Sequence, residues 1–152
     1  MEDRKSLAFG GEQKQFIVVK IGSERYGIDI TFIDNIVRMQ KITRVPKAQS
    51  YFKGVINLRG EVVPVMSIRL RMGLETDEYT NNSRIIIIKL EQQGSIGLIV
   101  DAVQEVVTLN PNEIDRISYD NAGSEKKTFI NGIGKHDGQL ISLLELTSVV
   151  AE

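Results

Sequence analysis

An internal repeat is the feature of the sequence that most constrains the fold. A shift of 78 residues carries Gly54 to Gly132 and Gly60 to Gly138, and it places apolar residues on apolar residues in the segments that follow. A hairpin needs residues that tolerate positive φ at its turn and alternate side chains that face a core. Because both features recur, the two segments are predicted to form the same hairpin.

The tips of the two hairpin copies differ in sequence. Asn57, Leu58 and Arg59 in the first copy become Lys135, His136 and Asp137 in the second. The fold therefore does not require the first set, and we interpret an exposed Leu58 beside Asn57 and Arg59 as a candidate contact site. The alternative for Arg59 is an ordinary surface arginine.

A second pair of hairpins repeats earlier in the chain, at an offset of about 70 residues. Phe16–Ile21 matches 85–90, and Tyr26-Gly27-Ile28 matches 96–98. Many short strands separated by turns favour small closed barrels, since closure removes exposed edges. The predicted fold is mostly β, with two pseudo-repeated five-stranded SH3-like or OB-like barrels packed together and short helices.

The domain prediction is one domain over residues 1–152 with two subdomains. The first spans about 15–72 plus a C-terminal closing segment, the second spans about 84–145, and polar residues 74–83 cross between them. Further expected elements are a short helix at about 30–37, a brief strand at 42–45, a helical turn at 68–72, a loop at 111–128 and a closing helix near the C-terminus.

The predicted helix at 30–37 has two readings. Ile30, Ile33, Ile36 and Val37 recur at helical spacing, so they either all face the core or partly line an apolar groove between the two barrels. The sequence favours neither reading.

Composition excludes several classes of function. A net charge of −1 and a pI near 5.9 argue against nucleic-acid binding. The chain has no cysteine, which excludes disulfides and thiol catalysis, and it has no long apolar run, so a cytoplasmic protein without direct membrane insertion is expected. His136 is the single histidine and is expected to be a solvated turn residue, so no metal, cofactor or enzymatic activity is predicted.

Several motifs together resemble the CheW family of bacterial chemotaxis coupling proteins. The resemblance covers residues 15–150, and its most specific part is the hairpin Gly54-Val55-Ile56-Asn57-Leu58-Arg59-Gly60 followed by Val63-Pro64-Val65. The other matching motifs are Tyr26-Gly27-Ile28-Asp29-Ile30, Thr43-Arg44-Val45-Pro46, Gly97-Leu98-Ile99-Val100-Asp101 and Gly132-Ile133-Gly134.

The resemblance implies a non-enzymatic adaptor with two protein partners. Such proteins link the cytoplasmic hairpin tips of chemoreceptors to the regulatory domain of the histidine kinase CheA, in arrays beneath the membrane. The receptors, the sensory pathway and the ring geometry are not specified by the sequence. Two alternatives stay open: a CheW-like fragment of a CheV-type adaptor, and a small β-barrel that binds a ligand or an oligonucleotide.

The resemblance also implies site residues. The expected receptor groove comprises Ile30, Ile33, Asn35, Ile36, Asn57, Leu58, Arg59 and Val100. Candidates for coupling to the kinase or the array are Gly54, Gly97, Val103 and Val106, although tight strand packing is the alternative for both glycines. Many relatives carry glutamate at the position of Asn35, so any bond from Arg59 to this residue is expected to be weaker here.

Overall fold

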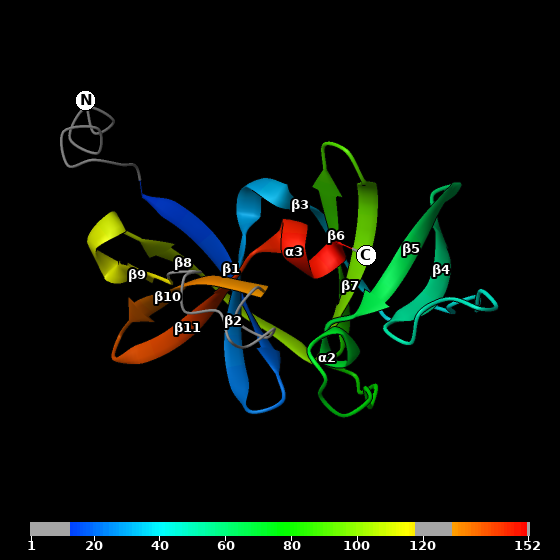
Figure 1. Ribbon diagram of the computed structural model, residues 1–152, viewed down its shortest axis with the longest axis horizontal. Helices are drawn as coiled ribbons and strands as arrows, with labels where there is room; N and C mark the ends of the chain where they lie inside the picture. The colour runs from blue at the N-terminus through cyan, green and yellow to red at the C-terminus, as the bar shows by residue number, and fades with distance from the viewer. Residues whose placement is uncertain (1–12, 118–128, 152) are drawn as a thin grey trace. The chain divides into compact units, whose positions relative to one another are not determined.

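The computed structural model describes residues 13–117 and 129–151, and these residues form two compact units (Figure 1). Of the described residues, the first unit comprises 13–19, Glu24–Ile30, 104–117 and 129–151, and the second comprises Lys20–Ser23 and Thr31–Val103. Each unit is built around one antiparallel-rich sheet. The prediction of a mostly β fold with two sheets and short helices is confirmed.

The second unit is a five-stranded barrel. Its strands lie in the order β3 (Ile33–Arg38), β6 (Arg84–Leu90), β7 (Gly94–Val100), β5 (Glu61–Ser67) and β4 (Phe52–Leu58). The two edge strands are joined through Thr43, which exchanges two backbone hydrogen bonds of 2.8 Å with Val55. This bridge brings the chain that follows β3 against the outer edge of β4, so the β4 edge has a partner. The helix α2 (Ile68–Arg71) follows β5 directly.

The sheet of the first unit has six strands. They lie in the order β8 (Ala102–Leu109), β1 (Lys14–Ile21), β2 (Glu24–Asp29), β11 (Gln139–Leu144), β10 (Ile130–His136) and β9 (Ile114–Arg116). After β8, the turn η2 (Pro111–Glu113) leads into β9, which pairs with β10 much as Thr43 pairs with β4. The helix α3 (Leu146–Val150) follows β11.

The predicted subdomain boundaries are wrong, because the two sequence repeats exchange their first hairpins. The β1–β2 hairpin joins the sheet of β10 and β11, and the β6–β7 hairpin joins the sheet of β4 and β5. The exchange is made by two parallel pairings, Leu143 opposite Gly27 and Val65 opposite Gly97. Each barrel therefore contains strands from both repeats, and residues 72–84 are not a boundary between units.

The predicted helix at 30–37 is also wrong. Ile30–Phe32 forms the single 3₁₀ turn η1, and Ile33–Arg38 is strand β3. A β-bulge between Ile33 and Asn35 adds one residue to the strand, so Ile33 pairs with Ile88 and Ile36 pairs with Ile86. An extra residue at a bulge brings positions three apart onto one face, and this spacing imitates the period of a helix.

Most other predicted elements are present. The two hairpins related by the 78-residue shift, the turn at 68–72 and the closing helix α3 are confirmed. The segment 42–45 contributes only the bridge at Thr43 rather than a strand, and the predicted loop 111–128 contains η2 and β9. Residues 118–128 of that loop lie outside the described residues.

The interior of each barrel is apolar and mostly aliphatic. In the second unit, the core contains Ile56, Val63, Val65, Ile85, Ile87 and Ile99. In the first unit, it contains Phe16, Val18, Val107, Leu109, Ile141 and Leu143. Val65 and Leu143 are equivalent in the repeat, and each faces a glycine across a parallel pairing. The repeat predicted from the sequence is therefore preserved in the packing of the two cores.

Candidate protein-interaction site

The turn between β4 and β5 holds its arginine in an unfavourable backbone conformation. Arg59 and Gly60 have φ of +54° and +85°, and the equivalent Asp137 and Gly138 have φ of +50° and +75°. Two-residue hairpin turns with positive φ at both positions favour asparagine, aspartate or glycine at the first. Asp137 fits this preference, whereas Arg59 does not. The arginine is therefore not the residue that the turn itself would select.

The side chains beside Arg59 stabilise the turn. The Asn57 Oδ1 atom accepts a hydrogen bond of 3.0 Å from the backbone N–H of Gly60. The prediction of an exposed Leu58 is wrong: this side chain is half-buried and packs against the core of the second unit. Its apolar surface is used by the barrel, since alternate residues of β4 face inward. Arg59 itself is exposed at the tip.

Asn35 makes a different contact from the one expected. Its Oδ1 atom accepts a hydrogen bond of 2.8 Å from the backbone N–H of Ile36. Strand β3 is at the edge of its sheet, where unpaired N–H groups need other acceptors. The amide of Asn35 thus caps the edge strand locally, and among the described residues Arg59 forms no ion pair or hydrogen bond.

Two of the predicted groove residues lie on the outer face of the second barrel. Ile36 shares this face with its cross-strand partners Ile86 and Leu98, which are both fully buried, whereas Val37 packs against the barrel core. Ile33 lies on the same outer face, because it pairs with Ile88, two residues from Ile86. Ile33 and Ile36 are half-buried. They keep apolar surface that the barrel interior does not use.

The strand registers place Ile33 and Arg59 toward the same end of this barrel. The β6–β7 turn, the β4–β5 turn and the start of β3 all lie at that end, as Figure 1 shows. Val100 lies at the opposite end, where it pairs with Arg84, and only 1% of it is exposed. A buried Val100 has no surface to offer to a partner.

The remaining predicted residues divide between the units. Ile30 and Val106 belong to the first unit, where Val106 is 54% exposed, and Val103 is a half-buried residue of the second. Gly54 and Gly97 are buried by packing. A Cβ atom on Gly97 would lie 2.7 Å from Ile85, and one on Gly54 would overlap the carbonyl oxygen of Thr43. Both glycines allow close approach of neighbouring chains.

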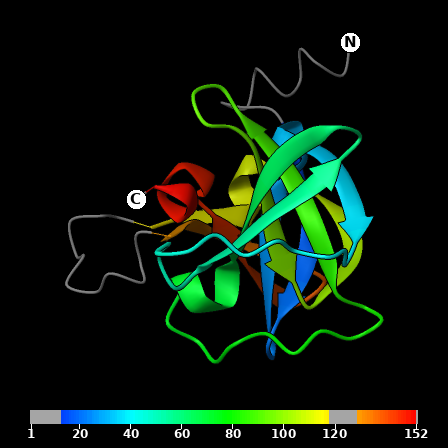
Figure 2. The same cartoon turned by 90° about the vertical axis from the view of Figure 1, so that its right-hand side faces the viewer.

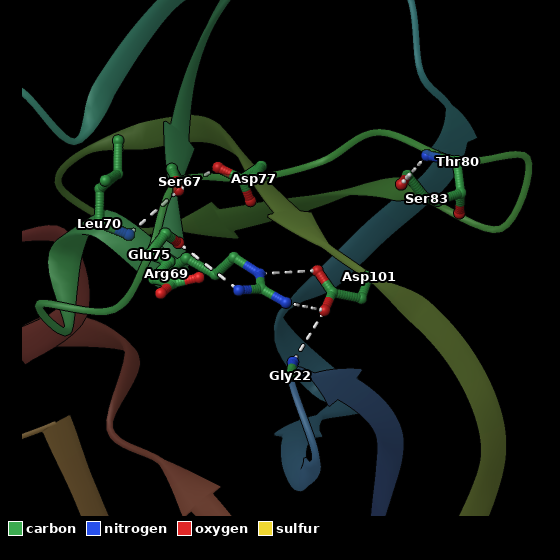
Figure 3. A network of polar contacts seen from close by, with 9 residues as sticks. All are labelled: Gly22, Ser67, Arg69, Leu70, Glu75, Asp77, Thr80, Ser83 and Asp101. Carbon is green, nitrogen blue, oxygen red and sulfur yellow. Dashed lines mark hydrogen bonds and ion pairs between the residues drawn. The ribbon is translucent and has the colours of Figure 1, made fainter.

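Sequence reasoning missed an ion pair at the far end of the second barrel. Arg69 donates from Nε to Asp101 Oδ1 at 3.0 Å and from Nη2 to Asp101 Oδ2 at 2.5 Å, and the N–H of Gly22 donates to Oδ2 at 2.7 Å (Figure 3). Burial alone would raise the pKa of Asp101, but the hydrogen bonds from Arg69 and Gly22 outweigh it and lower that pKa. The position of Asp101, a single charged residue directly after the apolar run that ends at Val100, was the feature of the sequence that could have indicated this ion pair.

Ser67 joins α2 to the long connection before β6. Its Oγ atom accepts from the N–H of Leu70 at 3.1 Å and donates to Asp77 Oδ2 at 2.5 Å, as Figure 3 shows. Ser67 is fully buried. The hydroxyl therefore caps the helix and also fixes the connection to it.

The described residues contain no group of side chains suited to hold a metal ion. His136, which was expected to be a solvated turn residue, is instead half-buried at the end of β10, and its Nε2 atom lies 3.5 Å from Asp137 Oδ2. No helix among the described residues is long and apolar enough to span a bilayer.

The family follows from comparison with known proteins. Residues 15–152 match the family model described as the CheW-like domain. The chain belongs to this family. The match extends over residues of both units.

Individual members of the family match over most of their length. The chain is 35% identical to the chemotaxis protein CheW of Bacillus subtilis, over 90% of this chain and 86% of the relative. It is 31% identical to the chemotaxis protein CheW of Helicobacter pylori, over 98% and 92%. The crystal structure of the scaffolding protein TtCheW from Thermoanaerobacter tengcongensis matches with a TM-score of 0.79 and 33% identity, over 87% of this chain and 88% of that one.

Proposed function

We propose that this chain is a non-enzymatic adaptor of bacterial chemotaxis, which links the cytoplasmic tips of chemoreceptors to the regulatory domain of the histidine kinase CheA. Membership of the CheW-like domain family and the names of its relatives support this role. The adaptor acts in the cytoplasm and is recruited to membrane-associated receptor arrays. It needs no cofactor and binds no nucleic acid.

The observation that carries the proposed contact site is the backbone conformation of Arg59. Arginine occupies a position with φ of +54° where the equivalent residue of the repeat is the favoured aspartate, Asp137. Residues held in disfavoured backbone regions cluster at functional sites. The side chain is exposed and has no partner within the described part of the second unit. Arg59 is therefore available to bind a carboxylate of a receptor or of the kinase.

The proposed receptor contact combines Arg59 with the apolar outer face of β3. Ile33 and Ile36 supply half-buried aliphatic surface, and the register places Ile33 toward the same end of the barrel as Arg59. Asn35 and Asn57 act by shaping β3 and the hairpin turn, since each amide accepts a backbone hydrogen bond. Val100, Gly54 and Gly97 are buried, so we assign them to the packing of the second unit and not to the contact surface.

The candidate residues on β8 are assigned to the contact with the kinase. Val106 on β8 is 54% exposed, which is unusual for a valine in a strand whose neighbours Val107 and Leu109 are fully buried. We assign Val106 and the half-buried Val103 to this contact. Exposed aliphatic residues in a rigid strand are suitable centres for a small protein interface.

A pull-down with purified components tests the proposal. The chain is mixed with the regulatory domain of CheA and with a soluble receptor hairpin, and the bound fraction is measured. Arg59→Asn is expected to weaken assembly about tenfold, because it removes a charge-assisted contact without straining the turn. Asp137→Asn, the same type of change at the equivalent turn, is the control and leaves assembly unchanged. Failure of the unmodified chain to bind either partner at about 50 µM contradicts the proposed function.

A further inference from the structure

The segment from Asn35 to Gly60 has an uneven charge. It contains no aspartate or glutamate, although the whole chain has a net charge of −1. Its six cationic residues are Arg38, Lys41, Arg44, Lys47, Lys53 and Arg59. Three of them, Lys41, Arg44 and Lys47, lie in the connection between β3 and β4, which is coloured cyan in Figure 2. This connection is therefore a local basic surface on an overall acidic protein.

The β3–β4 connection borders a hollow of about 650 Å³ in the second unit. Arg44, Lys47 and Lys53 line it together with Val45, Phe52 and Tyr79, and no acidic residue does. Val45 is 38% exposed and Tyr79 is 48% exposed. Within residues 13–117 and 129–151, none of the three cations forms an ion pair. The hollow thus combines uncompensated positive charge with apolar surface.

The walls of the hollow are held in place. The two hydrogen bonds between Thr43 and Val55 hold the connection against β4, and the N–H of Phe52 donates to the carbonyl of Gln49 at 3.0 Å. Lys47 has φ of +63°, a conformation that is uncommon for lysine. A site whose walls are already ordered loses less conformational entropy when a ligand binds. The hollow is therefore preorganised for binding.

We propose that this hollow binds an acidic polypeptide segment of a partner protein, in which carboxylates alternate with apolar side chains. The carboxylates contact Arg44, Lys47 and Lys53, and the apolar side chains contact Val45 and Tyr79. The volume lies within the usual range for binding pockets, about 300–1,000 Å³. Carboxylates and apolar side chains are expected to alternate in the bound segment, because cationic and apolar residues lie beside each other in the wall of the hollow.

The observations favour a peptide over a nucleic acid or an anionic membrane. A phosphate backbone is bound by a continuous positive surface, and here the cations are confined to one hollow on a chain with net negative charge. Single strands also need a row of stacking aromatics, whereas Tyr79 is the one exposed aromatic ring that lines the hollow. A short acidic segment matches the size and the charge of the site.

This surface is distinct from the receptor site proposed above. The hollow includes Phe52 and Lys53 at the start of β4, whereas Arg59 follows the end of that strand. None of the residues assigned to the receptor or kinase contacts lines it. The inference therefore does not depend on the proposed function, and the two can fail separately.

Fluorescence anisotropy with a labelled octapeptide of alternating glutamate and leucine tests the proposal on the full chain. We expect saturable binding with a Kd below about 100 µM at low salt, weakening as salt screens the contacts. Lys47→Glu combined with Lys53→Glu is expected to weaken binding at least tenfold. Lys14→Glu combined with Lys89→Glu changes two exposed strand lysines and the net charge equally, so it is the matched control and keeps the affinity within twofold. Arg44→Gln combined with Lys47→Gln, which reverses no charge, should weaken binding severalfold with an unchanged melting temperature.

Three outcomes would overturn the proposal. The first is the absence of saturable binding up to about 1 mM peptide. The second is an equal loss of affinity in the control variant, which would mean that only net charge matters. The third is tighter binding of an eight-residue thymidine oligonucleotide or of phosphatidylserine vesicles, since either would identify a phosphate-binding surface instead. Binding of receptor and kinase is expected to be unchanged in all of these variants.

Discussion

Arg69 and Asp101 form a two-point ion pair that joins α2 to the end of β7. The two hydrogen bonds, of 3.0 and 2.5 Å, run between the planar guanidinium and both carboxylate oxygens. Asp101 also accepts from the N–H of Gly22, and its own N–H donates to the carbonyl of Lys20 at 3.0 Å. One carboxylate thus connects the β1–β2 turn, α2 and β7. The side chains of Arg69 and Asp101 are 20% and 26% exposed.

This ion pair makes stability depend on pH. The pKa of Asp101 is lowered in the folded protein from its ordinary value of 3.8, because the bonds from Arg69 and Gly22 outweigh the effect of burial. A carboxyl whose pKa is lowered by folding stabilises the protein above its unfolded pKa and loses that effect as pH falls through the folded pKa. Asp101→Asn should therefore cost about 2 kcal/mol at pH 6, and the difference should shrink below about pH 4.

Urea unfolding of the unmodified chain and of Asp101→Asn between pH 3 and pH 7 measures this effect. Asp34→Asn is the control, since Asp34 is exposed on β3 and has no hydrogen bond or ion pair among the described residues. A constant difference between Asp101→Asn and the unmodified chain over the whole range would contradict the prediction.

Gly54 and Gly132 provide a matched pair for testing how the barrels close. A Cβ atom on Gly54 would overlap the carbonyl oxygen of Thr43, and its φ is +140°, whereas one on Gly132 would lie 3.2 Å from the carbonyl oxygen of Asp115. Gly54→Ala should lower the free energy of unfolding by about 3 kcal/mol, because the new methyl group would overlap a backbone atom and the positive φ disfavours any side chain. Gly132→Ala should lower it by about 1 kcal/mol, because the closer contact there can be relieved by a small shift. Thermal melting of both variants checks the order, and equal losses would show that the Thr43 bridge is not tight.

Arg59 should be replaceable with a gain in stability. Asparagine and aspartate adopt positive φ more readily than arginine, so Arg59→Asn should raise the free energy of unfolding by about 0.5–1 kcal/mol. The converse change, Asp137→Arg, should lower it by a similar amount at the equivalent turn. Chemical denaturation of both variants measures the effect. If Arg59→Asn destabilises the chain, the arginine supports the fold and its assignment to a partner contact loses its basis.

Ile33 and Val37 lie on opposite faces of β3, and the same substitution should separate their roles. Ile33→Glu places a carboxylate on the half-buried outer face, so the chain should fold while receptor binding falls at least tenfold. Val37→Glu places it against the barrel core, where an uncompensated charge costs several kcal/mol, and the chain should unfold. Melting curves and pull-downs report the two effects. Unfolding of both variants would mean that Ile33 is a core residue.

Local pattern was enough to predict much of this protein. The turn glycines and the alternation of apolar residues predicted four hairpins, their repeat and a mostly β fold, because hairpin pairing joins neighbours in the chain. The unusual tip at Arg59 was also evident, since comparison with Asp137 needed nothing but the repeat. These features depend on residues close together in sequence.

Other features were decided only by the tertiary structure. The pairing of Val65 with Gly97 and of Leu143 with Gly27 exchanges hairpins between repeats, and either repeat offers the same alternation to either partner. The bulge in β3 gave Ile33 and Ile36 a helical spacing within a strand. Arg69 and Asp101 meet only after β5 pairs in parallel with β7. Sequence alone predicted most of the strands, although not β3 or β9. The choice of partner strand depended on contacts between distant residues, which periodicity does not encode.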